Sequence, residues 1–162
     1  SPLDGCRAEE SARGAEAGSA NLKFMELEAQ GIGISLLPSA NAVEVFQGVV
    51  AEMDAAIAVQ DYERWAALNS DLHRTINEIA GMPLLREMTD RVLSRWERLR
   101  RHYFHGVVVP RVVQAQGEHH ALLGALVRRD PDGAEHIVRA HNQAAQAAYA
   151  DFLQRGDSTQ ES

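Results

Sequence analysis

The sequence has little of three things: cysteine, long apolar runs and positive charge. Its 162 residues include one cysteine, Cys6, so an internal disulfide is excluded and a reducing compartment is favoured. No apolar run approaches the roughly 20 residues that a membrane-spanning helix requires. Lys and Arg number 16 against 23 Asp and Glu, and the net charge of −7 would repel a phosphate backbone. We therefore expect a cytoplasmic protein that has no membrane partner and does not itself bind nucleic acid.

The sequence does have the size and composition of one globular domain. Apolar residues make up 45% and charged residues 24% of the chain, as in average soluble proteins. We place this domain at residues 39–154 and interpret residues 155–162 as a polar tail. Residues 1–38 fit no regular pattern, and we interpret them as partly disordered or as a first helix. Because the chain starts with Ser1 rather than Met, we expect a preceding segment in the parent protein.

From about residue 39 onward, apolar residues repeat with the 3.6-residue period of amphipathic helices. The pattern predicts five helices, over residues 41–60, 61–80, 83–103, 110–129 and 131–152. Asn41 and Glu44 resemble a capping box at the first start, and Gly81 is suited to a helix end. We expect a chain break at Gly106 and an interruption or kink near Gly117. No strand pattern appears, so the fold class is all-α, an antiparallel helix bundle.

Three histidines fall on helix faces that a bundle core should make apolar. His119 shares its face with Leu122 and Leu126, and His73 and His141 lie on similar faces of two other helices. One such histidine is usually a core residue whose ring nitrogens have protein partners. Each buried imidazole without partners costs about 1–3 kcal/mol, and one shared divalent metal would satisfy all three. The residues alone leave both interpretations open.

Three segments, in order, resemble the FCD domain, the FadR C-terminal-type ligand-binding domain of GntR-family transcription regulators. They are NSDLHRTINEIAGMPLL at residues 69–85, EHHALLGAL at 118–126 and DPDGAEHIVRAH at 130–141. The resemblance covers about residues 39–149. It implies an FCD-like bundle of six to seven helices, attached behind a winged helix-turn-helix in regulators that act as dimers.

The resemblance also implies a divalent metal ion, with zinc or nickel as the first expectation, and a small organic acid that completes its coordination. Carried over residue by residue, the metal ligands are His73, His119 and His141, with Asn69 in the place of the family's carboxylate. Asn69 is neutral and therefore a weaker ligand than Asp. Met82 is a second departure, because it stands where the family motif has Asn.

An anionic effector needs a cation besides the metal. Residues 85, 88, 92, 95, 99 and 102 form the expected core-facing line of the helix over 83–103, and this line includes Arg95. A guanidinium there is costly unless it is paired or binds a carboxylate. We predict that Arg95 binds the effector; the alternative is an Arg paired within the bundle.

The leading hypothesis is an effector-sensing and dimerisation domain, not an enzyme. It would form a homodimer, bind a small carboxylate metabolite, and reach DNA only through an N-terminal domain missing from this chain. Two alternatives stay open: a three-histidine helical-bundle metalloenzyme and a dimerisation module with a degenerate site. The enzyme would need a general base near the metal. The only carboxylate next to a proposed ligand, Glu118, points away from the direction of His119 on its helix.

Overall fold

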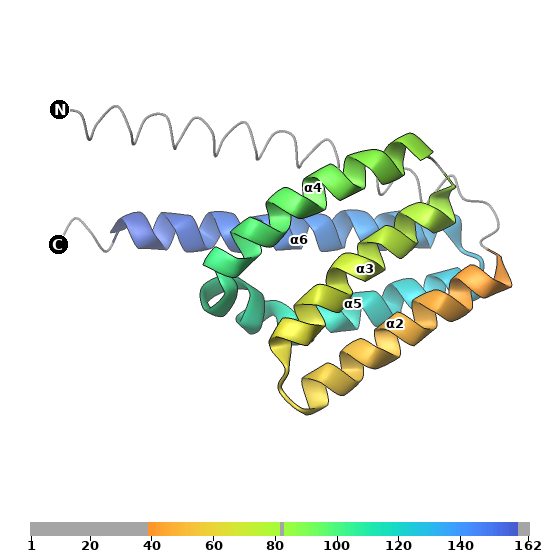
Figure 1. Ribbon diagram of the computed structural model, residues 1–162, viewed down its shortest axis with the longest axis horizontal. Helices are drawn as coiled ribbons and strands as arrows, with labels where there is room; N and C mark the ends of the chain where they lie inside the picture. The colour runs from red at the N-terminus through yellow and green to blue at the C-terminus, as the bar shows by residue number, and fades with distance from the viewer. Residues whose placement is uncertain (1–38, 82, 159–162) are drawn as a thin grey trace.

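The computed structural model describes residues 39–81 and 83–158, which form five α-helices and one π-helical segment and contain no strand. In chain order these elements are α2 (Ala40–Ala58), α3 (Tyr62–Ala80), α4 (Pro83–His102), η1 (Phe104–Val108), α5 (Val109–Val127) and α6 (Pro131–Ser158). Helices joined by short turns run in opposite directions (Figure 1). The predicted all-helical bundle is confirmed. The segment 1–38, predicted to be disordered or a first helix, lies outside the described residues.

Short polar side chains and one glycine set the helix ends. The Ser39 hydroxyl accepts a hydrogen bond from the Ala42 amide at 3.1 Å, so α2 starts before Asn41, where a capping box was expected. Asp61 caps α3 in the same way. Gly81 ends α3 in the left-handed conformation, with φ of 65°, which glycine adopts without steric penalty. The prediction for Gly81 is confirmed.

The chain break expected at Gly106 is wrong, because the backbone remains helical there as the π-helix η1 and runs directly into α5. Gly106 serves close packing instead: a Cβ atom at this position would overlap the ring of Phe152 from α6. The helix α5 also continues without interruption through Gly117. Likewise, α6 continues beyond the expected end at residue 152, so residues 155–158 of the predicted tail are helical.

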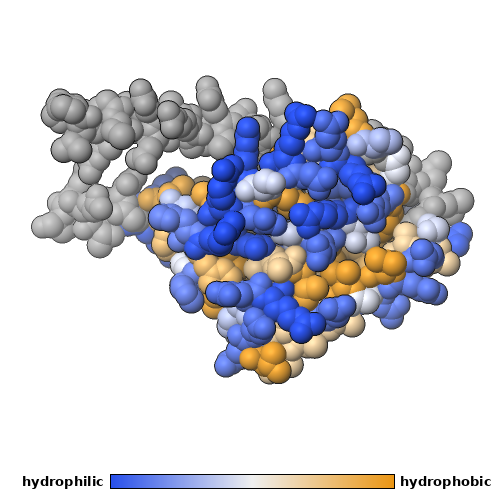
Figure 2. Space-filling model, viewed as in Figure 1, coloured by the Kyte–Doolittle hydropathy of each residue, from blue (hydrophilic) through white to orange (hydrophobic). Residues whose placement is uncertain are grey.

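The core lies where α2 packs against α3 and α5. Phe46, Met53 and Leu72 are fully buried, and each contributes about 1.5–3 kcal/mol relative to an exposed side chain. Helix α4 packs against α3 and η1, whereas α6 packs against α5 and η1. The outer face of α3 and α4 is largely hydrophilic (Figure 2). Among the helices that the structure describes, none combines the length and apolarity required to cross a bilayer.

Candidate functional site

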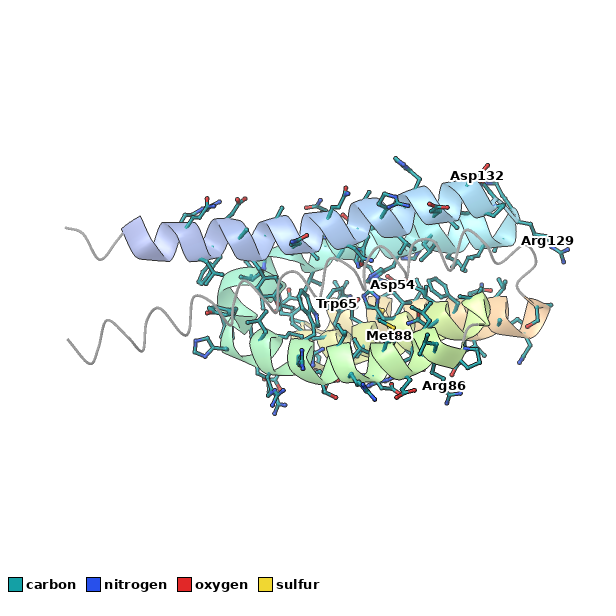
Figure 3. All side chains as sticks on the ribbon, turned by 90° about the horizontal axis from the view of Figure 1, so that it is seen from above. Asp54, Trp65, Arg86, Met88, Arg129 and Asp132 are labelled. Carbon is teal, nitrogen blue, oxygen red and sulfur yellow. The ribbon has the colours of Figure 1, made fainter. Side chains whose placement is uncertain are left out.

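A cavity of about 80 Å³ lies between α3, α4, α6 and the η1–α5 segment. Its apolar wall is formed by Trp65, Val92, Leu93, Trp96, Val107, Val108, Ala115 and Ala145. Its polar lining consists of Asn69, His73, Arg100, Arg111, His141, Asn142 and Tyr149. Figure 3 shows Trp65 between α6 and α4. This combination of an apolar wall and a few polar groups is typical of small-molecule sites.

The three predicted histidines come from three helices: His73 of α3 and His141 of α6 line this cavity, and His119 of α5 lies against His141 without lining it. The ring centres of His119 and His141 are 4.9 Å apart, and those of His73 and His141 are 5.7 Å apart. Two imidazoles that share a tetrahedral zinc have ring centres about 5 Å apart, given zinc–nitrogen bonds of about 2.0–2.1 Å. The pair His119–His141 therefore has the spacing of a shared ion.

His73 lies slightly farther out than a shared ion requires. Within the described residues, no group of three or more His, Cys, Asp or Glu side chains is already arranged to hold a metal. The centres of the His73 and His141 rings are farther apart than the shared-zinc spacing by roughly half an ångström.

His119 has one ring nitrogen bonded and one without a partner. Its Nδ1 lies 3.2 Å from Gln116 Oε1, while its Nε2 is buried and has no hydrogen-bond partner among the described residues. The side chain is only 2% exposed, and burial lowers the pKa of His119 well below its usual value. The imidazole is therefore neutral at pH 7, with a ring nitrogen that no group of residues 39–81 or 83–158 satisfies. A metal ion or a ligand donor would satisfy it.

His141 is anchored by a carboxylate that we did not predict as part of the site. Its Nδ1 donates a hydrogen bond to Glu118 Oε2 at 2.6 Å, and Arg111 donates to the same oxygen at 2.7 Å. Burial opposes ionisation of Glu118, but the hydrogen bond from His141 and the charge of Arg111 together lower its pKa below the usual value. With Nδ1 engaged, His141 has Nε2 left for another partner. A carboxylate behind a histidine is the usual outer-shell arrangement of metal-bound imidazoles.

Asn69 takes the position that the resemblance gives it. It lines the cavity together with His73, which follows it by one helical turn, and its Oδ1 is buried without a hydrogen-bond partner among the described residues. An unpartnered amide oxygen beside the histidines fits a ligand position. The donor set is therefore three imidazoles and one neutral oxygen.

Arg95 is exposed and does not line the cavity, so its predicted core-facing position is wrong. The buried face of α4 contains Leu85, Thr89 and Leu93 and continues to Arg100. From position 89 onward it is therefore shifted by about one residue from the face that the sequence predicted. Arg100 lines the cavity and donates hydrogen bonds to the carbonyl of Ala66 and the hydroxyl of Ser70. Burial lowers the pKa of Arg100, although the charge of Glu97 acts in the opposite direction.

The family model of the FCD domain matches residues 25–144. The chain belongs to the FCD domain family. The match begins within the segment 1–38, which sequence reasoning placed outside the domain, and it includes all three histidines and Asn69. The predicted family is confirmed.

Other comparisons concern relatives of this FCD domain. No curated protein matches the sequence. Among solved structures, the chain is similar to Escherichia coli McbR/YncC, with 20% sequence identity and a TM-score of 0.71. The similarity covers 85% of this chain and 64% of that one, so the FCD domain spans less than two-thirds of the McbR/YncC chain. At this level of identity the similarity supports the fold.

Proposed function

We propose that this FCD domain is the effector-sensing and dimerisation domain of a GntR-family transcription regulator. The family match and the fold shared with McbR/YncC support a regulatory domain that binds a small molecule. DNA binding would belong to a separate domain of the parent protein, because this chain carries a net charge of −7. The proposal gives the domain no catalytic role.

The domain binds a divalent metal, with zinc and nickel as the first candidates, through His73, His119, His141 and Asn69. One observation carries this part of the proposal: imidazoles from three helices form one cluster beside the cavity, and His119 Nε2 is buried with no hydrogen-bond partner in the described part of the chain. The anchoring of His141 by Glu118 supports it, because an ionised carboxylate increases the basicity of the ring nitrogen on the far side. The neutral oxygen of Asn69 makes the affinity lower than an Asp ligand would.

The effector is a small carboxylate with an apolar body. Its carboxylate would bind the metal and the Arg100 guanidinium, which has hydrogen bonds only to uncharged oxygens among the contacts described above. The indole rings of Trp65 and Trp96 form much of the remaining wall, so the other end of the ligand meets apolar surface. A polyhydroxylated acid would leave hydroxyl groups without partners there.

Effector binding then changes the packing of the helices that form the cavity. The ligand contacts α3, α4 and α6 together, and it favours the arrangement in which all three approach it. In a homodimer, such a change would alter the distance between the two DNA-binding domains. The coupling is a difference in ligand affinity between two dimer geometries.

Metal binding and thermal unfolding test the proposal. We expect the protein purified without chelators to hold about one zinc or nickel ion per chain, and the metal-free protein to take up one on addition. At a ligand concentration 100 times Kd, an acid that binds the folded state adds about 2.7 kcal/mol of stability, enough to raise Tm by about 5–10 °C. Aromatic and branched aliphatic acids are the probes, compared with citrate and gluconate.

An exposed histidine on another helix provides a matched control. His119→Ala should abolish metal uptake, whereas His136→Ala, a change of an exposed histidine on α6, should leave it intact. A wild-type protein that takes up neither metal would refute the metal site. Chemical turnover of a bound acid would refute the sensor hypothesis in favour of the metalloenzyme.

A further inference from the structure

A chain of hydrogen bonds connects His119 to helix α2 through Gln116. Gln116 Oε1 lies 2.9 Å from Trp65 Nε1 and 3.2 Å from His119 Nδ1. On its other side, Gln116 Nε2 donates to the backbone oxygen of Val50 at 3.2 Å and to Asp54 Oδ1 at 2.7 Å. Gln116 is 5% exposed; its contacts with Trp65, His119 and Val50 are buried, and its contact with Asp54 is partly buried.

The donors and acceptors of this network allow only one arrangement. Val50 O and the Asp54 carboxylate only accept, so the group of Gln116 that faces them must be its amide NH₂. Trp65 Nε1 only donates, so the group facing it must be the oxygen Oε1. Since Oε1 is an acceptor, His119 Nδ1 must carry a hydrogen and donate it. The neutral ring then holds its lone pair on Nε2, the nitrogen that has no partner among the described residues.

We infer that Gln116 is a positioning residue that fixes the Nδ1–H tautomer of His119 and so presents Nε2 to the metal. This inference rests on the proposed metal site. Trp65 assists, because its ring is stacked on His119 with centres 5.9 Å apart and planes 22° apart, and the same indole donates to Gln116. The contacts with Val50 and Asp54 hold the amide NH₂ of Gln116, on the side away from His119. They therefore connect the proposed metal ligand His119 to α2.

The role of Gln116 resembles that of Glu118 behind His141, with one difference. Glu118 brings a negative charge, whereas Gln116 brings a neutral acceptor whose direction depends on α2. The series of hydrogen bonds that starts at His119 ends at the surface, where the exposed Asp54 side chain also contacts His120 Nε2 at 2.9 Å. Two of the three proposed ligands are thus oriented through Nδ1 by side chains of α5.

Nitrogen NMR of the metal-free full chain tests the tautomer directly. In the wild-type protein, His119 should show a protonated Nδ1 and an unprotonated Nε2 at neutral pH. Gln116→Met removes the acceptor at nearly constant volume and should produce a mixture of tautomers or the Nε2–H form. Gln47→Met, an exposed change on α2, is the matched control and should leave the signals of His119 unchanged.

Zinc affinity, measured by competition with a chelator, is the second measurement. Gln116→Met should weaken it by about 10–100-fold, the usual effect of removing an outer-shell partner, and Gln47→Met should not change it. A wild-type His119 protonated at Nε2 would overturn the inference whatever the metal does, and so would unchanged zinc affinity in Gln116→Met. A wild-type protein with the Nδ1–H tautomer and no zinc binding would refute the metal site and the role of Gln116 toward it, while upholding the hydrogen-bond assignment.

Discussion

Glu118→Gln separates the charge of the carboxylate behind His141 from its shape. The variant keeps an oxygen that can accept the hydrogen bond from His141 Nδ1, and it removes the negative charge that Arg111 and His141 share at 2.7 and 2.6 Å. The three side chains are 11–22% exposed, so solvent screens the interaction only in part. The charge should therefore matter to metal affinity.

The magnitude follows from the two kinds of hydrogen bond. A bond to a charged group contributes about 1.5–3 kcal/mol, and a neutral one about 0.5–1.5 kcal/mol. Exchanging one for the other removes about 1–1.5 kcal/mol from the metal-bound state, where His141 is most polarised. The metal-free protein has the same bond and shares part of this loss; since 1.4 kcal/mol is a factor of ten, zinc affinity should fall by up to about tenfold.

The assay is zinc competition against a chromogenic chelator, with thermal unfolding of the metal-free protein as the check on folding. Glu135→Gln is the matched control, because it removes the same charge from a pair with Arg139 on α6 that does not reach the histidines. That half-buried pair, one helical turn apart, is worth about 0.3–0.5 kcal/mol, so the control should change stability little and zinc affinity not at all. Equal zinc affinity in Glu118→Gln and wild type would refute the reasoning that Glu118 supports a metal-bound His141.

Three further results are expected. In the metal-free protein, the unfolded chain takes up a proton at His119 below its usual pKa of 6.5, whereas burial keeps the folded ring neutral; the free energy of unfolding should therefore fall as pH drops from 7 to 5, more steeply than in His119→Asn, and equal slopes in urea titrations would contradict this. Arg100→Gln should reduce the Tm increase given by apolar-bodied acids and leave zinc affinity unchanged; an undiminished shift would remove Arg100 from the effector site. Gly106→Ala should destabilise the fold by about 1–3 kcal/mol because the new Cβ meets Phe152, whereas Gly117→Ala, in open space on α5, should stabilise it by about 0.5–1 kcal/mol; the same sign for both would contradict the packing described here.

The sequence was sufficient to predict the helices and to select the three histidines. The apolar period of the α2 and α3 segments is regular, and Gly81 marks the end of α3. His73, His119 and His141 could be selected because each interrupts an otherwise apolar face, and the family motifs reinforced the selection.

The inner face of α4 could not be predicted, because a polar residue occupies its centre. Thr89 is 1% exposed and lies 2.6 Å from Asn77 Nδ2 and from the Leu85 carbonyl. If apolar residues are assigned to the core, the predicted orientation of α4 places Val92 on the inner face, and Arg95 with it. In the structure, the arginine of α4 that lines the cavity is Arg100, and Arg95 is exposed.

The residues behind the histidines were also beyond sequence reasoning. Glu118 was set aside because it points away from His119 on the same helix, yet it points toward His141 on α6. Gln116 and Trp65 are 51 residues apart, and their contact depends on how α3 packs against α5. Helical periodicity assigns a direction to each side chain, but it does not identify the helix that the side chain meets.

The central claim is that His73, His119 and His141 share one metal ion, and a crystal of the zinc-loaded protein, with anomalous data at the zinc edge, tests it most directly. If the three histidines share an ion, we expect one zinc per chain beside the cavity, bonded to one ring nitrogen of each histidine at about 2.0–2.1 Å. The ligand atom of His119 and of His141 should be Nε2. A zinc bound elsewhere, or electron density with no ion among the three rings at saturating zinc, would contradict it.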